Sequence, residues 1–169
     1  SEVGEYIKRA SARWRLFSAS VLIAFSAYPA GVRAQFGCEK PVYLTLDTGH
    51  MGIAHLVAQV LARQQVVVTF FAANEPTQQG DGSLGSYWSA WWRDRAAEGH
   101  AFASHTWNHT YWRADAGTPT APAFRVRPSA GPRAGQEFIL SAAQYCDEIT
   151  QSARRLQALT GQVPLPLFR

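Results

Sequence analysis

The sequence of 169 residues has little charge of either sign and no basic face. Charged side chains make up 17% of it and hydrophobic ones 47%, a composition that excludes a disordered acidic or basic tail. Five basic against two acidic groups give residues 1–34 a net charge of +3, and eleven against ten give residues 35–169 a net charge of +1. The chain therefore lacks the positive surface of a nucleic-acid-binding protein, and we expect no nucleic-acid partner.

The sequence also lacks a long apolar run. Leu16–Ala27 is apolar but shorter than the roughly 20 residues that cross a bilayer. It follows the cationic segment Lys8–Arg15 and precedes a short small-residue stretch that ends at Ala34, a pattern typical of a secretory signal peptide. We therefore expect residues 1–34 to be a cleaved leader and the chain to be exported, periplasmic or extracellular, without a stable membrane anchor. The alternative is an uncleaved membrane helix.

Cysteine is scarce: the sequence contains two, Cys38 and Cys146. Export would place both in an oxidising compartment, where they can pair. Two separate thiols are the alternative, because the sequence does not bring their Cα atoms within the ~7 Å that a disulfide requires.

The first part of the chain predicts a strand, a helix and a second strand. Val42–Leu46 is rich in β-formers and predicts a buried strand. From Ile53 to Arg63 the apolar residues follow a helical stripe. A second β-rich run follows at Val66–Phe71. Short links between these elements indicate a right-handed βαβ unit with parallel strands.

The rest of the chain alternates loops with further elements. The loop 74–86 formally matches G-x-G-x-x-G at residues 80–85, but it lies too far from the preceding strand for dinucleotide binding, and a flexible loop is predicted. We expect a helix over 87–98 ending at Gly99, a strand over 100–104, a surface excursion over 118–135, and an amphipathic helix over 138–159 closed by Gly161.

Ionisable side chains follow two of these strands. Asp47 ends the first strand, and His105 and His109 follow the third. Functional groups collect at the carboxyl ends of parallel strands, and histidines four apart are well spaced to share a divalent ion. The sequence therefore predicts that Asp47, His105 and His109 lie together. Alternatively, Asp47 and Thr48 cap the helix that follows.

These residues resemble the NodB-like polysaccharide deacetylases (carbohydrate esterase family four). The resemblance rests on L-T-L-D-T-G at 44–49, V-T-F-F at 68–71, E-G-H at 98–100 and S-H-T-W-N-H at 104–109. It is strong from Pro41 to Trp112 and weak elsewhere. It implies an α/β fold, a partial distorted (β/α) barrel, and metal-dependent removal of N-acetyl groups from a polysaccharide or peptidoglycan-like sugar, which is hydrolysis of a carbon–nitrogen bond.

The resemblance also implies roles for individual residues. Asp47 matches the catalytic base, and His105 and His109 match two ligands of a divalent metal, expected to be Zn²⁺. Thr48 stands where the family has a metal-binding acid, so the third ligand is open between His50, a reoriented Asp47 and water. Arg169 resembles the arginine that opens the third family motif, and we include it among the catalytic residues.

The same resemblance predicts that residues 35–169 are an incomplete deacetylase domain, truncated at the C-terminus and inactive alone. The family's acid is a histidine near the C-terminus, and no histidine follows His109. A carbohydrate-binding relative without catalysis is the main alternative, and a purely structural domain is a third.

Other aromatic and imidazole groups receive weaker predictions. Five tryptophans are candidates for stacking on sugar rings, although aromatics at helical spacing usually belong to the core; they are Trp88, Trp91, Trp92, Trp107 and Trp112. His55 and His100 receive no role.

Overall fold

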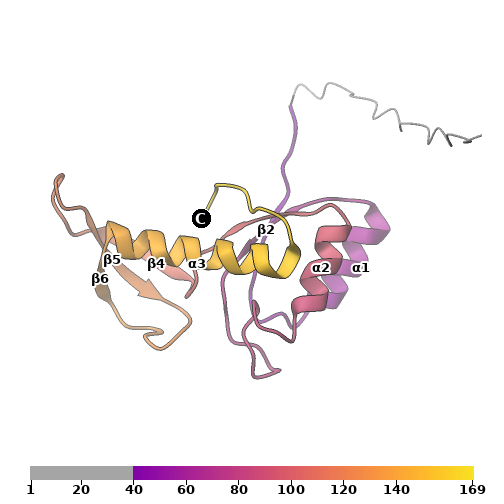
Figure 1. Cartoon of the computed structure of the whole chain (residues 1–169), viewed down its shortest axis with the longest axis horizontal. Coiled ribbons are helices and arrows are strands. Elements are labelled where there is room, and N and C mark those ends of the chain that lie inside the picture. Colours follow the sequence, from indigo (N-terminus) through magenta and orange to yellow (C-terminus); the bar gives the residue numbers. More distant parts are fainter. Residues whose placement is uncertain (1–39) are drawn as a thin grey trace, which may run out of the picture. The chain divides into compact units, whose positions relative to one another are not determined.

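A computed structural model describes residues 40–169 (Figure 1). The predicted leader, residues 1–34, and Cys38 lie outside the described residues. Cys146 is exposed and has no disulfide partner within residues 40–169, so its pairing stays a prediction. No helix in the described part of the chain is long and apolar enough to cross a membrane.

Two βαβ units form a parallel sheet, as the alternating pattern predicts. The elements are β1 (Thr45–Asp47), α1 (Ala54–Gln64), β2 (Thr69–Ala72), α2 (Ser89–Ala97) and β3 (Ala101–Ser104). The strand order is β1-β2-β3, all parallel. Their carboxyl ends therefore lie at one edge of the sheet.

The last residues of the chain continue this sheet beyond β3. The amide of Leu165 donates to the carbonyl of Phe102 at 2.8 Å, and Ser104 forms a parallel bridge with Phe168. Strands β1, β2 and β3 and the C-terminal residues therefore lie side by side in sequence order, which is consistent with part of a NodB-type fold. Residues 40–169 nevertheless form an open sheet, so the expected barrel is not seen in them.

The start of β1 corrects the prediction of a buried strand over Val42–Leu46. Val42, Tyr43 and Leu44 are exposed, and the strand begins only at Thr45. The reason is that β1 lies at the edge of the sheet, where within residues 40–169 it pairs only with β2.

The core-facing side of α1 also differs from the predicted stripe. Ile53, Leu56 and Val60 are exposed, whereas Ala54 and Ala58 are buried. Val57 and Leu61 of the predicted stripe are half-buried against the core, so the stripe is confirmed at these two residues, and only the other three bulky side chains remain on the surface.

An aromatic core lies between the parallel sheet and its helices. Trp88, Trp91 and Trp92 are buried, and the rings of Trp91 and Trp92 pack edge-on against Phe70. These three tryptophans are core residues rather than sugar-stacking surfaces. Trp107 is half-buried against the same core, and Trp112 is exposed.

The loop 74–86 is packed rather than flexible, which corrects another expectation. Ser83 and Leu84 are almost fully buried. The Ser83 hydroxyl donates to the carbonyl of Ala73 at 2.6 Å and accepts from the amide of Glu75 at 2.9 Å. These bonds hold the loop against the end of β2, where it places Glu75.

A second, antiparallel sheet was not predicted. It contains β4 (Thr110–Asp115), β5 (Ala123–Pro128) and β6 (Phe138–Ser141) in that order. The predicted surface excursion over 118–135 is therefore wrong at β5. This strand alternates an apolar face, which includes the buried Val126, with a face that carries arginines.

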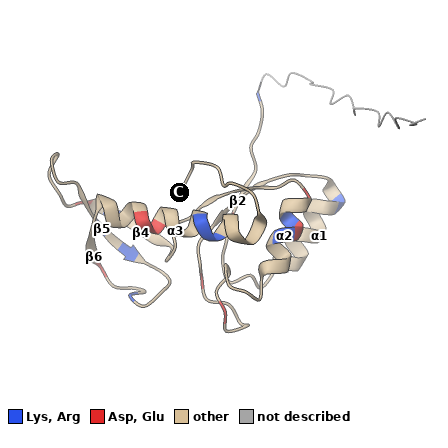
Figure 2. Cartoon of the chain, viewed as in Figure 1, with Lys and Arg blue, Asp and Glu red and all other residues tan. Residues whose placement is uncertain are grey.

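The helix α3 (Ala142–Thr160) lies along both sheets (Figure 1). It begins four residues later than predicted because Ser141 and Gln144 form a reciprocal capping box. Gly161 ends the helix with a φ of 72°, as predicted. The Lys and Arg positions are scattered over several of the described elements (Figure 2).

Candidate active site

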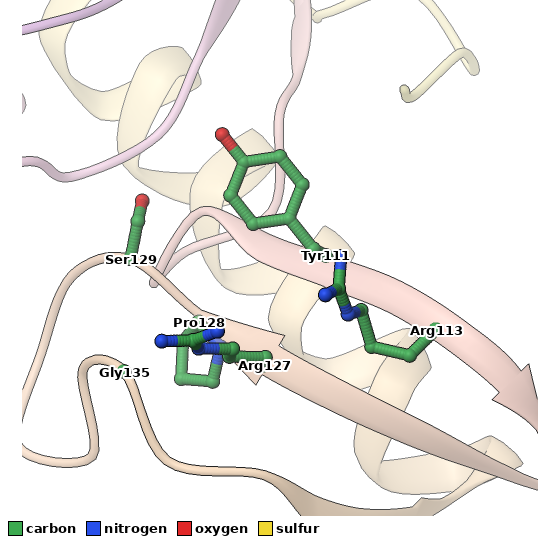
Figure 3. Close-up of a pocket in the computed structure, with 6 residues that line it drawn as sticks. All are labelled: Tyr111, Arg113, Arg127, Pro128, Ser129 and Gly135. Atoms are coloured by element: carbon green, nitrogen blue, oxygen red, sulfur yellow. The ribbon is translucent and has the colours of Figure 1, made fainter.

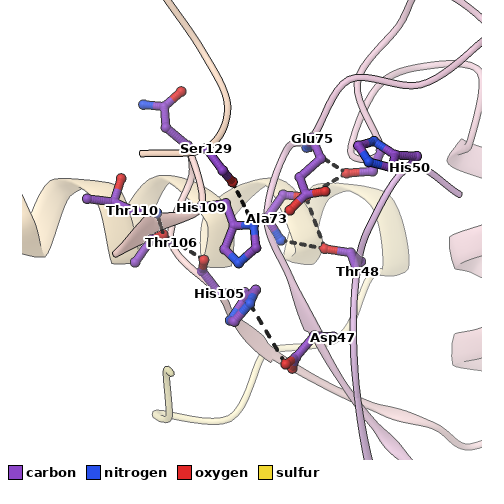
Figure 4. Close-up of polar contacts among 12 residues, drawn as sticks. Asp47, Thr48, His50, Ala73, Glu75, His105, Thr106, His109, Thr110 and Ser129 are labelled. Carbon is purple, nitrogen blue, oxygen red and sulfur yellow. Dashed lines mark hydrogen bonds and ion pairs between the residues drawn. The ribbon is translucent and has the colours of Figure 1, made fainter. Parts of the chain in front are cut away.

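Asp47 stands at the carboxyl end of β1, where its carboxylate meets Arg169. Nε and Nη2 of Arg169 lie 2.8 and 2.6 Å from Oδ1 of Asp47. Oδ2 of Asp47 faces the imidazole of His105, whose Nε2 is 3.9 Å away (Figure 4). The structure therefore brings together three predicted site residues from three distant parts of the sequence.

His105 and His109 lie in a tight loop that follows β3. Their ring centroids are 4.5 Å apart, so the predicted juxtaposition is present. The loop is not a helical turn, because Thr106 and His109 have left-handed backbones with φ of 61° and 50°. Such a conformation is costly for residues other than glycine, and the surrounding structure must hold it.

Glu148 on α3 holds this loop. Its carboxylate accepts hydrogen bonds from the amide of Asn108 at 2.8 Å, from Nδ2 of Asn108 at 2.6 Å and from the hydroxyl of Thr110 at 3.0 Å. Inside the loop, the amide of Thr110 donates to the hydroxyl of Thr106 at 2.6 Å. The two imidazoles are therefore positioned by a long-range contact with the final helix.

Both imidazoles use Nδ1 for contacts with oxygen atoms. Nδ1 of His105 lies 2.6 Å from the carbonyl oxygen of Arg169. Nδ1 of His109 is in contact with the Glu75 carboxylate and lies 2.9 Å from the Ser129 hydroxyl (Figure 4). A carbonyl or an ionised carboxylate only accepts a hydrogen bond, so these partners favour the tautomer with the proton on Nδ1. Nε2 of each ring then carries the free lone pair.

Burial reinforces this neutral state at His105. The pKa of His105 is below its ordinary value because burial penalises the charged imidazole, and the nearby Asp47 carboxylate only partly offsets that effect. A neutral imidazole is the form that binds a metal ion.

Thr48 and His50 are turned to other partners. The Thr48 hydroxyl accepts from the amide of Ala73 at 2.8 Å and lies 3.3 Å from the Ala73 carbonyl oxygen. It thus links the residue after β1 to the residue after β2. Nδ1 of His50 lies 3.2 Å from the carbonyl oxygen of Pro76. The structure therefore does not bring His50 to the two loop histidines.

The side chains that could bind a metal ion come together in carboxylate–imidazole pairs. Asp47 lies beside His105, and Glu75 lies beside His109. Within residues 40–169, no group of three His, Cys, Asp or Glu side chains is arranged to hold a metal ion.

Glu75, Ser129 and Glu148 are site residues that the sequence analysis missed. Each is a single polar residue without a motif around it; Glu75 and Ser129 contact His109, and Glu148 contacts the loop residues Asn108 and Thr110, only through tertiary packing. Glu75 carried one usable signal, because it follows the second predicted strand just as Asp47 and His105 end the first and third.

Comparison with known proteins identifies the family of the chain. The family model for polysaccharide deacetylases matches residues 35–169. The chain belongs to this family. No characterised relative and no solved structure gives a significant match. Membership of the polysaccharide deacetylases implies, at a coarse level, hydrolysis that removes acetyl groups from carbohydrate.

Proposed function

We propose that the chain is a metal-dependent hydrolase that removes N-acetyl groups from a polysaccharide or a peptidoglycan-like sugar. The observation that carries the proposal is the 3.9 Å approach of Asp47 to His105, beside His109, at the carboxyl ends of parallel strands. A carboxylate base next to two imidazoles is the donor set of a metal-assisted hydrolase.

The chemistry of the two histidines fits a divalent ion such as Zn²⁺. Metal-binding histidines commonly give their second ring nitrogen to a carbonyl or carboxylate, which fixes the tautomer; Nδ1 of His105 and of His109 have such partners. His105 and His109 would hold the ion through Nε2, with Asp47 or water completing the site. When bound, the ion polarises the acetamide carbonyl and makes a bound water more acidic.

Asp47 acts as the base in this proposal. Arg169 holds Oδ1, which leaves Oδ2 on the side of His105 to accept a proton from the attacking water. Asp47 then holds the proton that the leaving amine needs. Arg169 is a positioning residue in this scheme, because it contacts the carboxylate of Asp47.

Metal binding can be tested with single variants. The chain loaded with Zn²⁺ should retain about one ion per molecule, measured by mass spectrometry and by titration calorimetry. His105→Ala and His109→Ala should each lose it, whereas His55→Ala, an exposed histidine outside the site, should not. Equal metal content in all four proteins would contradict the proposal.

Catalysis requires a separate test. Acetate release from N-acetylglucosamine oligomers should be measured on the longest natural form of the chain, and Asp47→Asn should abolish it. One observation favours a second candidate, a carbohydrate-binding protein without catalysis: the Thr48 hydroxyl is bound to the backbone of Ala73. Oligomer binding that persists without any acetate release would support that candidate.

We also propose that the protein is exported after cleavage behind Ala34. The support is the sequence pattern of residues 1–34. Exported protein should begin at or near Gln35 when its N-terminus is sequenced, and an N-terminus at Ser1 would contradict this.

A further inference from the structure

A pocket of about 370 Å³ lies beside His109, on the antiparallel sheet. Its lining comes from β4, β5 and the segment after β5, and consists of Tyr111, Arg113, Arg127, Pro128, Ser129 and Gly135 (Figure 3). Its volume is within the range of roughly 300–1,000 Å³ that ligand pockets occupy.

Two contacts join this pocket to the candidate active site. The hydroxyl of Ser129 lies 2.9 Å from Nδ1 of His109, and the ring of Tyr111 lies 4.7 Å from the His109 ring between centroids. If one sugar of a polysaccharide is bound at His109, the adjacent sugar of that polysaccharide therefore lies at the pocket.

The pocket carries two cations that are weakly neutralised. Arg127 is exposed and forms no ion pair within residues 40–169. Arg113 has a single partner, Glu137, at 3.8 Å, and both side chains are half-exposed. An exposed pair at this distance contributes little, so Arg113 can exchange Glu137 for another anion.

The backbone places both arginines on one face. Tyr111 pairs directly with Arg127 across β4 and β5, so the two side chains share a face of the sheet. Arg113 lies at the irregularity in the register between Trp112 and Ala114. A bulge at this point redirects a side chain without interrupting the rest of the ladder, and Arg113 lines the same pocket as Arg127.

We propose that this pocket binds a carboxylate carried by a sugar next to the N-acetylated one, so that the substrate is an acidic N-acetylated polysaccharide. The inference rests on the proposed function and adds the class of substrate. The guanidinium group presents a planar fork that matches a carboxylate, and the exposed ring of Tyr111 offers a flat surface for the sugar.

The test is equilibrium binding to the 169-residue chain by titration calorimetry. The main probe is a tetrasaccharide of alternating N-acetylglucosamine and glucuronic acid, compared with the same oligomer after reduction of its carboxylates to alcohols. A disaccharide of N-acetylglucosamine and N-acetylmuramic acid supplies the carboxylate on an ether side chain instead of on the ring. We expect one of the two acidic probes to bind about tenfold more tightly than the reduced oligomer, with the difference falling as salt rises.

Arginine variants locate the effect. Arg127→Gln and Arg113→Gln should each remove most of the preference for the acidic probe, without changing the affinity for the reduced oligomer. Arg125→Gln is the matched control, because Arg125 is an exposed arginine of the same strand that does not line the pocket. Circular dichroism of each variant should be unchanged.

The outcomes separate this inference from the proposed function. Equal affinity for acidic and reduced oligomers, or a preference that survives both pocket variants, would overturn the pocket assignment and leave deacetylation standing. A preference that depends on Arg127 and Arg113, without acetate release from any oligomer by the longest natural form, would support the pocket and overturn the proposed hydrolysis.

Discussion

Replacing Glu148 with Gln should loosen the loop that carries both candidate metal-binding histidines. The carboxylate of Glu148 accepts three hydrogen bonds, two from Asn108 and one from the Thr110 hydroxyl. Glutamine has nearly the same shape, but it keeps one acceptor oxygen and turns an NH₂ group toward a donor. At least one of these hydrogen bonds is therefore lost, and the new NH₂ group faces a donor of the loop at that position.

The expected loss of stability follows from these bonds. A hydrogen bond to a charged group contributes about 1.5–3 kcal/mol, and Glu148 is only partly buried, so we expect a loss of about 2 kcal/mol. The left-handed backbone conformations of Thr106 and His109 should become less populated, because the hydrogen bonds to Glu148 hold the loop that contains them.

The assay is urea unfolding combined with amide hydrogen exchange. Glu148→Gln should lower the free energy of unfolding and speed exchange at the amides of Asn108 and Thr110, and it should weaken zinc binding. Asp147→Asn is the matched control, since Asp147 is the preceding residue on α3, is exposed and forms no ion pair in the described chain. Equal stability and equal exchange in the two variants would refute the role given to Glu148.

Three further predictions concern stability. His100 is buried and accepts a hydrogen bond from the amide of Val68 at 3.1 Å, and burial lowers its pKa below the ordinary value of 6.5. The unfolded chain then binds the proton more readily, so the free energy of unfolding should fall as the pH drops below about 6.5. Urea unfolding at about pH 7.5 and about pH 5.5 should show a smaller change in the free energy of unfolding for His100→Gln than for the unchanged chain. An equal change in the two proteins would contradict this. Thr48→Val should cost about 1–2 kcal/mol, because the amide of the buried Ala73 loses its acceptor, yet leave zinc binding intact; a loss of zinc would instead make Thr48 a ligand. Trp92→Ala should cost about 3–5 kcal/mol in thermal or urea unfolding, because Trp92 is fully buried in the aromatic core, and a loss below 1 kcal/mol would place the core elsewhere.

The parallel part of the fold was predictable because its signals are local. Strand, helix and strand each have their own hydrophobic period, and short links leave one way to connect them. The proximity of Asp47 to His105 follows from that topology, since both end strands of one parallel sheet.

The antiparallel sheet was not predictable in the same way. In β5 the apolar residues Phe124 and Val126 alternate with arginines, but prolines and glycines on both sides hide so short a pattern. At β6, Phe138 lies four residues before Ala142 and so also fits the start of a helix, and the boundary is decided by the cap at Ser141. Local propensity alone leaves such choices open, and packing against α3 settles them.

The supporting residues of the site depend on tertiary structure. Glu75 reaches His109 from a loop, and Glu148 reaches the same region from a helix 38 residues beyond Thr110. Glu75 is marked only by its place after the second predicted strand, and nothing in the sequence around Glu148 distinguishes it from an ordinary surface acid. Only the folded chain shows which carboxylates face the imidazoles.

The contact between Asp47 and Arg169 has a consequence for how the site assembles. The two residues are 122 positions apart, so their pairing closes nearly the whole described chain and carries a large loop-closure cost. The strands β1 to β3 form from contacts between near neighbours, and they can assemble before the last residues join β3. During folding, the Asp47 backbone should therefore reach its place first, and the Arg169 contacts with the Asp47 carboxylate and with His105 should be the last features of the site to form.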